Sequence, residues 1–309
     1  MTEQTARAVV MIRPHRFSSN PETVLDNAFQ QPTVMDDAEL IAQRARMEFD
    51  AAVAQLRAVG VVVHVFDDTP TPDKPDAVFP NNWFSTHEDG RVVLYPMATP
   101  SRRAERRRDV IDQLRRNYRV SEVVDYTAFE TRGLYLEGTG SLVLDYVHRL
   151  AYVSLSGRAM IEPLEKFCAD FGYEPITFES QDLEGRPIYH TNVMMCLGKE
   201  LALIGLDSIR QADERRKVRA CLEKTGKTIV ELTPQQIANF AGNALELQNG
   251  RENLLVLSER AGAQLTPAQR RTIERLTRLV LLSLPTIELA GGSARCMLAA
   301  IHLPLLADA

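Results

Sequence analysis

A recurrence of strand pairs along the chain is the feature that most restricts its fold. Patterns of strand, turn and strand begin at Asn82, Ser141, Asn192 and Asn243, and a final apolar strand begins at Ala294. The first interval is 59 residues, and each of the three that follow is 51 residues. Asn-Gly and Asp-Gly dipeptides between apolar runs are typical of hairpin turns. A period near 50 residues predicts a repeat architecture whose functional sites form where the units converge.

Each strand pair is followed by a helical pattern and a further apolar strand. The helices are expected at residues 101–117, 157–171, 207–224 and 266–278, and the strands at residues 121–125, 174–178, 227–232 and 279–284. The N-terminal part supplies a strand at 8–12, a helix at 36–58 and a strand at 61–66. Pairing of the strand at 294–301 with the strand at 8–12 would complete a fifth ββαβ unit. We therefore predict one α/β domain over residues 1–309, a five-bladed propeller; a mixed α/β fold with coincidental spacing is the alternative.

The charge balance argues against some classes of partner. Lys and Arg number 36 against 41 Asp and Glu, which gives a formal net charge of −5. This is not the balance of a protein that grips nucleic acid or anionic lipid. The chain shows neither a membrane-length apolar run nor the pattern of a secretion signal. We expect a cytoplasmic protein without nucleic-acid or membrane partners. The basic run at residues 101–108 is interpreted mainly as the solvated start of a helix, and not as a binding surface for such partners.

The cysteines argue against disulfides and zinc. Cys168, Cys196, Cys221 and Cys296 are too few for a disulfide scaffold and show no CxxC spacing. The first three are interpreted as core residues, as are most buried cysteines. We expect no metal and no cofactor.

Polar residues gather at the starts of the repeats. The five entry segments are residues 79–82, 136–140, 189–192, 240–243 and 291–296. They offer the amide of Asn82, the carboxylate of Glu137, the imidazole of His190 and the thiol of Cys296. A thiol and an imidazole from separate loops, with a carboxylate nearby, are typical of nucleophilic acyl or amidino transfer.

These segments resemble the guanidine-modifying superfamily of arginine deiminases, dimethylarginine dimethylaminohydrolases and amidinotransferases. Residues 76–82 resemble its D-x-x-F-x-x-D strand, 136–140 its E-G-G-D turn, 190–192 its H-x-D motif, and 291–296 its glycine-rich loop ending in the nucleophile. Residues 98–103 are similar to an A-P-S-R-R stretch of the dimethylaminohydrolase branch. The closest resemblance is to the citrulline-utilisation hydrolases.

The resemblance implies a cysteine hydrolase and assigns roles to residues. Cys296 would attack the central carbon of the substrate as a thiolate. His190 would protonate the leaving nitrogen and then activate water, while Glu137 would orient His190. Asn82 and Asn192 would hold the planar group.

Further contacts would complete the substrate site. Asp76 would contact the nitrogens or an amino group of the substrate. Arg102 or Arg103 would pair with the α-carboxylate, and Arg13 is a further candidate. For Arg102 and Arg103 a place on the solvated face of a helix remains the alternative. The long loop at residues 13–35 is of the kind that forms lids, binding loops or disordered segments, and a lid here would exclude water until substrate arrives.

Three positions that hold aspartate in deiminases hold Asn82, Gly140 and Asn192 here. A guanidinium offers only donors and favours carboxylate acceptors, whereas a ureido carbonyl needs a donor such as an amide NH2. The preferred substrate is therefore a small amino acid, citrulline, cleaved to ornithine, ammonia and CO2. An arginine or methylarginine deiminase, an amidinotransferase and a non-catalytic binding protein remain alternatives, and a homo-oligomer is possible.

Overall fold

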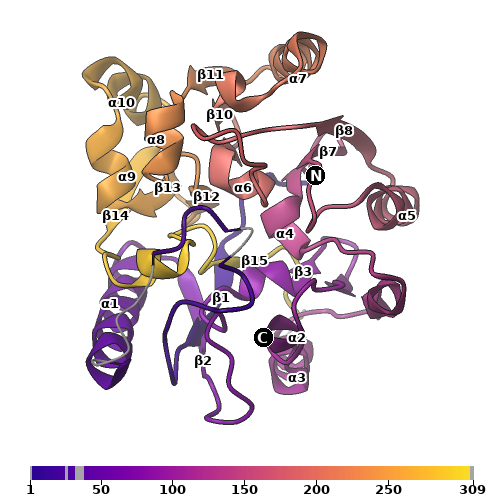
Figure 1. Ribbon diagram of the computed structural model, residues 1–309, viewed down its shortest axis with the longest axis vertical. Helices are drawn as coiled ribbons and strands as arrows, with labels where there is room; N and C mark the ends of the chain where they lie inside the picture. The colour runs from indigo at the N-terminus through magenta and orange to yellow at the C-terminus, as the bar shows by residue number, and fades with distance from the viewer. Residues whose placement is uncertain (1, 25–26, 32–37, 307–309) are drawn as a thin grey trace.

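Within residues 2–24, 27–31 and 38–306, which are the residues that the computed structural model describes, the fold is built from five three-stranded sheets (Figure 1). In spatial order they are β15 (Ala299–Ile301), β1 (Ala8–Arg13) and β2 (Val62–Asp67); β3 (Phe84–Thr86), β4 (Arg91–Leu94) and β5 (Glu122–Asp125); β6 (Val143–Asp145), β7 (Leu150–Ser154) and β8 (Glu174–Phe178); β9 (Met195–Leu197), β10 (Leu201–Ile204) and β11 (Thr228–Glu231); β12 (Leu245–Gln248), β13 (Asn253–Ser258) and β14 (Arg278–Leu282). In each sheet the middle strand pairs antiparallel with one neighbour and parallel with the other.

Helices make the crossovers that the parallel strand pairs require. They are α1 (Ala38–Ala58), α2 (Pro100–Arg103) with α3 (Arg108–Asn117), α5 (Ile161–Phe171), α7 (Ala212–Lys224), and α9 (Glu259–Gln264) with α10 (Pro267–Glu274). The order of strand, helix and strand agrees with the sequence prediction in every repeat. A break between α2 and α3 divides the single helix expected at 101–117. Residues 36–37 of the helix expected at 36–58 lie outside the described residues.

The first strands of the repeats start later than the sequence patterns indicate. The residues before β3, β6 and β9 form short helical turns instead: η2 (Pro80–Asn82), α4 (Gly138–Ser141) and α6 (Thr191–Met194). The prediction of strand at these positions was wrong because the backbone bonds locally: the Gly140 N–H donates to Glu137 O at 3.1 Å, and the Cys296 N–H to Ser293 O at 3.0 Å. The polar entry residues therefore lie on tight turns.

The last strand returns to the first. β15 pairs antiparallel with β1, in a register that sets Ala8 opposite Ile301 and Val10 opposite Ala299. This confirms the expected pairing of the chain's two ends. Figure 1 shows the sheets around a common centre, with α1, α3, α5, α7 and α10 at the periphery and the short α4 and α6 near the centre. In the described part of the chain the sheets remain separate, and no closed sheet forms.

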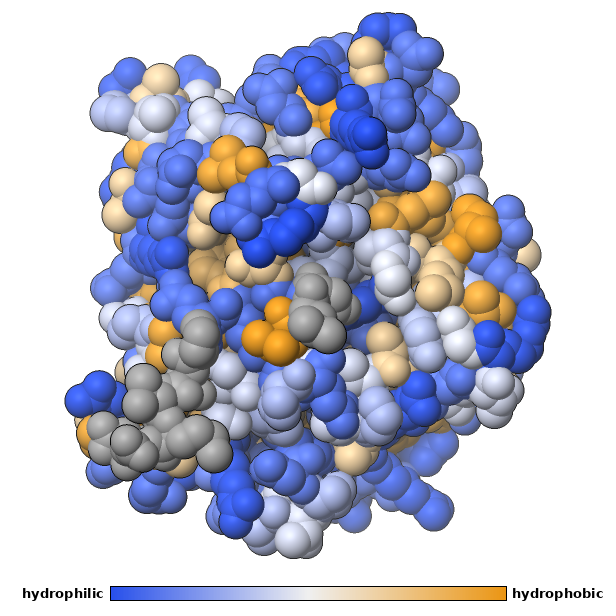
Figure 2. All heavy atoms as spheres, viewed as in Figure 1, coloured by the Kyte–Doolittle hydropathy of each residue, from blue (hydrophilic) through white to orange (hydrophobic). Residues whose placement is uncertain are grey.

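Apolar packing between each sheet and its helix holds the units together. Phe49 and Leu56 of α1, for example, are fully buried in one cluster with Met11 of β1 and Val256 of β13. Burial of such a side chain stabilises the fold by about 1.5–3 kcal/mol. The face in Figure 2 is largely hydrophilic, with apolar residues in separate patches. No helix among the described residues combines the length and hydropathy that crossing a membrane requires.

Candidate active site

Residues one repeat apart meet at the centre of the molecule. The Asn243 amide donates to Asn192 O at 3.1 Å, and the Arg295 N–H donates to Asn243 Oδ1 at 3.1 Å. The Thr191 hydroxyl donates to Ser141 O at 2.6 Å. The repeat interval therefore has a direct structural meaning, because residues 50–52 positions apart in successive units are hydrogen-bonded to each other.

The sulfur of Cys296 lies in this centre and faces two amide donors. Nδ2 of Asn243 is 3.2 Å from Sγ, and Nδ2 of Asn192 is 3.6 Å from it. The cysteine is 3% exposed. Donors aimed at sulfur stabilise negative charge on it, and the thiolate is the nucleophilic form of cysteine. The turn thus presents a sulfur suited to attack on a bound electrophile.

Glu137 is a buried anion that holds His190. Its Oε2 is 2.8 Å from His190 Nε2, and its Oε1 accepts the Ala98 N–H at 2.9 Å. Burial raises the pKa of Glu137, but Arg158, His190 and Arg102 together outweigh burial and hold that pKa at about 2. An ionised carboxylate only accepts hydrogen bonds, so Nε2 of His190 carries the hydrogen that is shared with it.

The second ring nitrogen of His190 faces Gly140 and Asn82. Burial lowers the pKa of His190, although Glu137 raises it, so the ring is neutral at pH 7. With the hydrogen on Nε2, Nδ1 has a free lone pair. A Cβ on Gly140 would stand 2.9 Å from His190 Nδ1 and would overlap the Asn82 amide. Nδ1 is therefore a base beside the Asn82 amide, in a space that exists because position 140 has no side chain.

Two contacts link the His190 segment to the Cys296 loop. Asn192, two residues after His190, donates to the sulfur. The hydroxyl of Tyr189, the residue before His190, donates to Gly291 O at 2.7 Å. Hydrogen bonds thus link the segments that carry Cys296, His190 and Glu137.

Arg102 lies inside the site and not on a solvated face. It is 2% exposed, pairs with both oxygens of Glu105 at 2.9 and 3.0 Å, and lies 3.7 Å from both Asp76 and Glu137. With its carbonyl oxygen toward Arg102, the Asn82 amide accepts from Nη1 at 2.8 Å and Nη2 at 3.0 Å. The solvated interpretation of the basic run was wrong here because three buried carboxylates draw this guanidinium inward.

Asp76 is held from the N-terminal loop. Asn20 Nδ2 donates to its Oδ2 at 2.8 Å and to the Ser101 hydroxyl at 3.1 Å. Burial raises the pKa of Asp76, against the lowering effect of Arg102 and Asn20. The same loop reaches the Cys296 loop, since Asn27 Nδ2 donates to Ala290 O at 3.2 Å. The described parts of residues 13–35 therefore contact both Asp76 and the Cys296 loop, while residues 25–26 and 32–35 lie outside the described residues.

The two remaining arginine candidates are placed differently. Arg103 is part-buried beside the site, where its guanidinium donates to the carbonyls of Met97 at 3.0 Å and Ala98 at 3.1 Å. Arg13 forms a two-bond pair with Asp50 of α1, both at 2.8 Å, on the exposed surface. Arg13 therefore contacts none of the other candidate residues.

Sequence reasoning missed Glu105, which pairs with Arg102, as well as Asn243 and Arg158. Asn243 lies one repeat after Asn192, and this equivalence was the signal that could have identified it. Arg158 lies 3.7 Å from Glu137 Oε2 and 4.8 Å from the centre of the Tyr189 ring. It lies outside every entry segment, so nothing in the sequence pattern indicated it. In the described residues no cluster of three or more His, Cys, Asp or Glu side chains is arranged to hold a metal ion.

The site and fold have counterparts in known proteins. A family model described as N,N dimethylarginine dimethylhydrolase, eukaryotic, matches residues 13–303. The N-terminal domain of ArgZ, an arginine dihydrolase from the ornithine-ammonia cycle in cyanobacteria, is similar in structure with a TM-score of 0.74 and 17% sequence identity. That match covers 97% of this chain and 99% of the ArgZ domain.

Two further solved structures share the fold. Unliganded AgrE matches with a TM-score of 0.75 and 15% identity over 97% of this chain, which spans only 40% of AgrE. A dimethylarginine dimethylaminohydrolase variant in an adduct with S-methyl-L-thiocitrulline matches with a TM-score of 0.66 and 14% identity, over 96% of this chain and 99% of that one. A search of curated protein sequences finds no match.

The fold and these matches define the chain as a guanidine-modifying hydrolase of the pentein class, which acts on carbon–nitrogen bonds. Specifically, the chain belongs to the N,N-dimethylarginine dimethylhydrolase family of eukaryotic type. The resemblance to this superfamily is thereby confirmed.

Proposed function

We propose that the protein cleaves the ureido group of citrulline, or of a closely similar amino acid, to give ornithine, ammonia and CO2 through a covalent adduct on Cys296. The observation that carries the proposal is the pair of amides around the reaction centre. Asn82 turns its carbonyl to Arg102, which leaves its NH2 end toward Gly140 and His190. One hydrogen of this NH2 is bonded to Asn81 at 3.2 Å, and the other remains for a substrate carbonyl.

Asn192 supplies the complementary acceptor. Its Oδ1 is buried and has no hydrogen-bond partner among the described residues, while its Nδ2 points at the Cys296 sulfur. A buried carbonyl without a donor costs about 1–3 kcal/mol, which a substrate N–H would recover. A ureido group carries both a carbonyl oxygen and N–H donors, so it matches the Asn82 donor and the Asn192 acceptor together.

The buried carboxylates favour the same choice. Both oxygens of Glu137 are already bonded, to His190 and Ala98, and Oδ2 of Asp76 is bonded to Asn20. A planar guanidinium with its five N–H groups would find few free acceptors here. Arginine is the second candidate substrate, because the ArgZ fold match is to an arginine dihydrolase.

The reaction balances with the groups present. Cys296 attacks the ureido carbon as thiolate, and its proton passes to Nδ1 of His190. The imidazolium, stabilised by Glu137, then protonates the departing nitrogen as ammonia and leaves a thiocarbamate on sulfur. Water, deprotonated by His190, releases the carbamate of ornithine, which loses CO2. Arg103 is proposed to pair with the α-carboxylate of the substrate, whereas the guanidinium of Arg102, the other candidate for this role, is bonded to Glu105 and Asn82.

We also interpret the five sheets as blades of a single propeller spanning the chain. Every sheet has the same strand order, and β15 returns to pair with β1.

Incubation of the purified protein with citrulline or arginine, followed by amino-acid analysis, tests the proposal. Ornithine formed from citrulline supports it, whereas accumulation of citrulline from arginine contradicts it. Cys296→Ser should abolish turnover, and the half-buried Cys221→Ser is the matched control that should not. Intact-mass spectrometry after brief mixing then identifies the leaving group. An adduct of citrulline minus ammonia indicates loss of ammonia first, and a carbamoyl-sized adduct indicates loss of ornithine first.

A further inference from the structure

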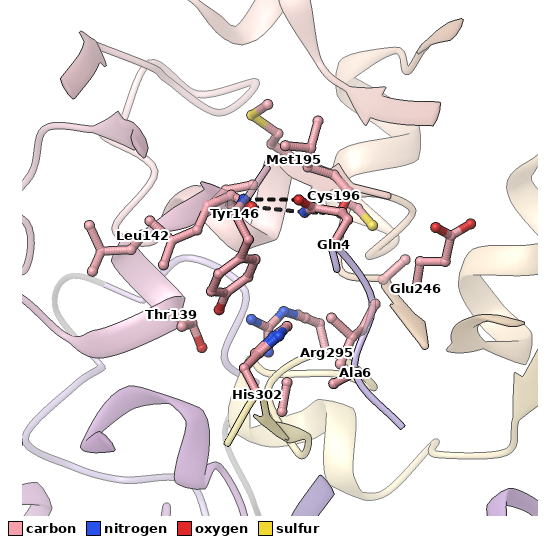
Figure 3. A pocket seen from close by; sticks show the side chains of 16 residues that line it. Gln4, Ala6, Thr139, Leu142, Tyr146, Met195, Cys196, Glu246, Arg295 and His302 are labelled. Carbon is pink, nitrogen blue, oxygen red and sulfur yellow. Dashed lines mark hydrogen bonds between the residues drawn. The ribbon is translucent and has the colours of Figure 1, made fainter. Parts of the chain in front are cut away.

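A small cavity lies behind the loop that carries Cys296. Its volume is about 40 Å³, and its lining includes Gln4, Thr139, Tyr146, Cys196, Arg295 and His302 (Figure 3). Arg295 immediately precedes Cys296, yet its side chain enters this cavity while the cysteine sulfur faces Asn192 and Asn243. The cavity is therefore a second polar space, separate from the one in which the sulfur lies.

Arg295 brings a buried positive charge into this cavity without a carboxylate to balance it. The residue is 9% exposed, and its side chain makes one hydrogen bond, from Nη1 to Leu298 O at 2.9 Å. No Asp or Glu pairs with it in residues 2–24, 27–31 and 38–306. Glu246 also lines the cavity, but its carboxylate accepts the Lys199 N–H at 2.6 Å and points away from Arg295 in Figure 3. An unpaired buried charge is costly, so a balancing group is expected.

Two further side chains beside Arg295 can donate hydrogen bonds. Figure 3 shows the Tyr146 and His302 side chains converging on the guanidinium. Burial, and then Arg295, lowers the pKa of His302 to about 3, so its ring is neutral and keeps one N–H. Burial raises the pKa of Tyr146 to about 12, so its hydroxyl stays protonated. Within the described part of the chain, the Tyr146 hydroxyl and the His302 ring nitrogens make no hydrogen bond to protein.

We propose that this cavity binds a small monovalent anion, of the size of chloride or bicarbonate, held by Arg295 with the Tyr146 hydroxyl and the His302 ring as further donors. One monovalent anion balances one guanidinium. The volume admits one such ion, since a single water needs only about 10–15 Å³ of this kind of space. A surface groove of about 360 Å³ shares Ala6, Tyr146 and His302 with the cavity and supplies a route of entry.

The anion site is connected to the reactive sulfur. The Arg295 N–H donates to Asn243 Oδ1 at 3.1 Å, and the same asparagine donates to Cys296 Sγ at 3.2 Å. An anion that fixes the Arg295 side chain therefore also fixes the turn that presents the nucleophile.

Thermal unfolding at constant ionic strength tests the proposal without reference to turnover. Sodium chloride and sodium bicarbonate are compared with sodium gluconate, whose anion is too large for the cavity. We expect the Tm to rise with the concentration of chloride, of bicarbonate or of both, relative to gluconate. The salt that raises the Tm shows whether the bound anion is chloride or bicarbonate. Equal midpoints in all three salts would overturn the proposal.

Variants locate the effect. Arg295→Met removes the charge and should abolish the anion-dependent rise in Tm, whereas the exposed Arg251→Met should retain it. If Arg295→Met fails to fold, Tyr146→Phe should fold and require a higher anion concentration for the same rise. If chloride is the anion that raises the Tm, crystals soaked in sodium bromide should show one anomalous peak within hydrogen-bond distance of Arg295, and the absence of that peak would contradict the assignment. A rise that persists in Arg295→Met would contradict the assignment whichever anion acts.

Discussion

Replacing Gly140 by alanine tests the geometry around His190 most directly. Gly140 lies in the helical turn α4 and does not have a positive φ, so its backbone accepts alanine without strain. The added Cβ would stand 2.9 Å from His190 Nδ1 and would overlap the Asn82 amide. The substitution therefore adds one methyl group to the space between the proposed base and the proposed carbonyl donor, and changes nothing else.

The expected cost is larger for catalysis than for stability. Overpacking a buried site costs about 1–3 kcal/mol, and alanine recovers about 0.5–1 kcal/mol of helix preference over glycine. We therefore expect Gly140→Ala to lower the free energy of unfolding by about 1–2 kcal/mol. Because the amide or the imidazole must move by about 1 Å, kcat/KM should fall by about 10²-fold.

Steady-state kinetics on the active substrate and thermal unfolding measure the two effects. Gly157→Ala is the matched control, because no atom lies within 4 Å of a Cβ at that position and its φ is not positive. The control should keep wild-type kcat/KM. A Gly140→Ala enzyme with kcat/KM within about twofold of wild type would refute the packing of His190 and Asn82 against this glycine.

Three further variants follow from the site. Glu137→Gln should lower kcat by about 10²–10⁴-fold, because the imidazolium loses its anionic partner. The pKa of Glu137 is about 2 in the folded protein, below the unfolded value of about 4.3, so the ionised carboxylate stabilises the fold above about pH 4.3 and this stabilisation is lost as the pH falls toward 2. The free energies of unfolding of the variant and the wild type should therefore converge on acid titration. Arg13→Ala should change the free energy of unfolding by at most about 1 kcal/mol and leave kcat/KM unchanged, because its pair with Asp50 is a surface pair; a large rise in KM would contradict this. Arg103→Ala should raise KM with kcat nearly unchanged if Arg103 binds the substrate carboxylate, and an unchanged KM would remove it from the substrate site.

The repeat made the larger architecture predictable. Each unit buries an apolar strand pair under an amphipathic helix, and hydrophobic periodicity reports such local burial. The entry turns were not predictable in the same way. α4 contacts both η2 and α6, which come from neighbouring units, so its helical turn depends on contacts about 50 residues away in the chain. The apolar run at 142–144 predicts a strand that begins at Ser141 or earlier, whereas β6 begins only at Val143.

The candidate site, like the fold, could be predicted from the sequence only in part. Cys296, His190 and Glu137 occupy repeat entries, so the pattern alone placed them near one another. The sequence alone did not decide against the solvated alternative for Arg102, because two of the carboxylates beside it, Asp76 and Glu137, are far from it in sequence, while its neighbours in the basic run are mostly exposed or part-buried. Burial of a charged side chain follows from its partners, and partners distant in sequence leave no periodic signal.

The charges of the buried cluster bear on the choice between a neutral and a cationic substrate. Three carboxylates, those of Asp76, Glu105 and Glu137, face two guanidiniums, those of Arg102 and Arg158, and His190 is neutral. Burial raises the pKa of Glu105 to about 7, which brings the cluster still closer to balance at neutral pH. Aspartates in place of Asn82 and Asn192 would add two negative charges, and only a cation such as guanidinium would then compensate them. With amides at both positions the cluster keeps at most one net negative charge before any ligand binds, against three if both were aspartates. A cationic guanidinium would therefore meet much less compensating charge here than in an aspartate-lined site, which supports the proposal of a neutral ureido substrate.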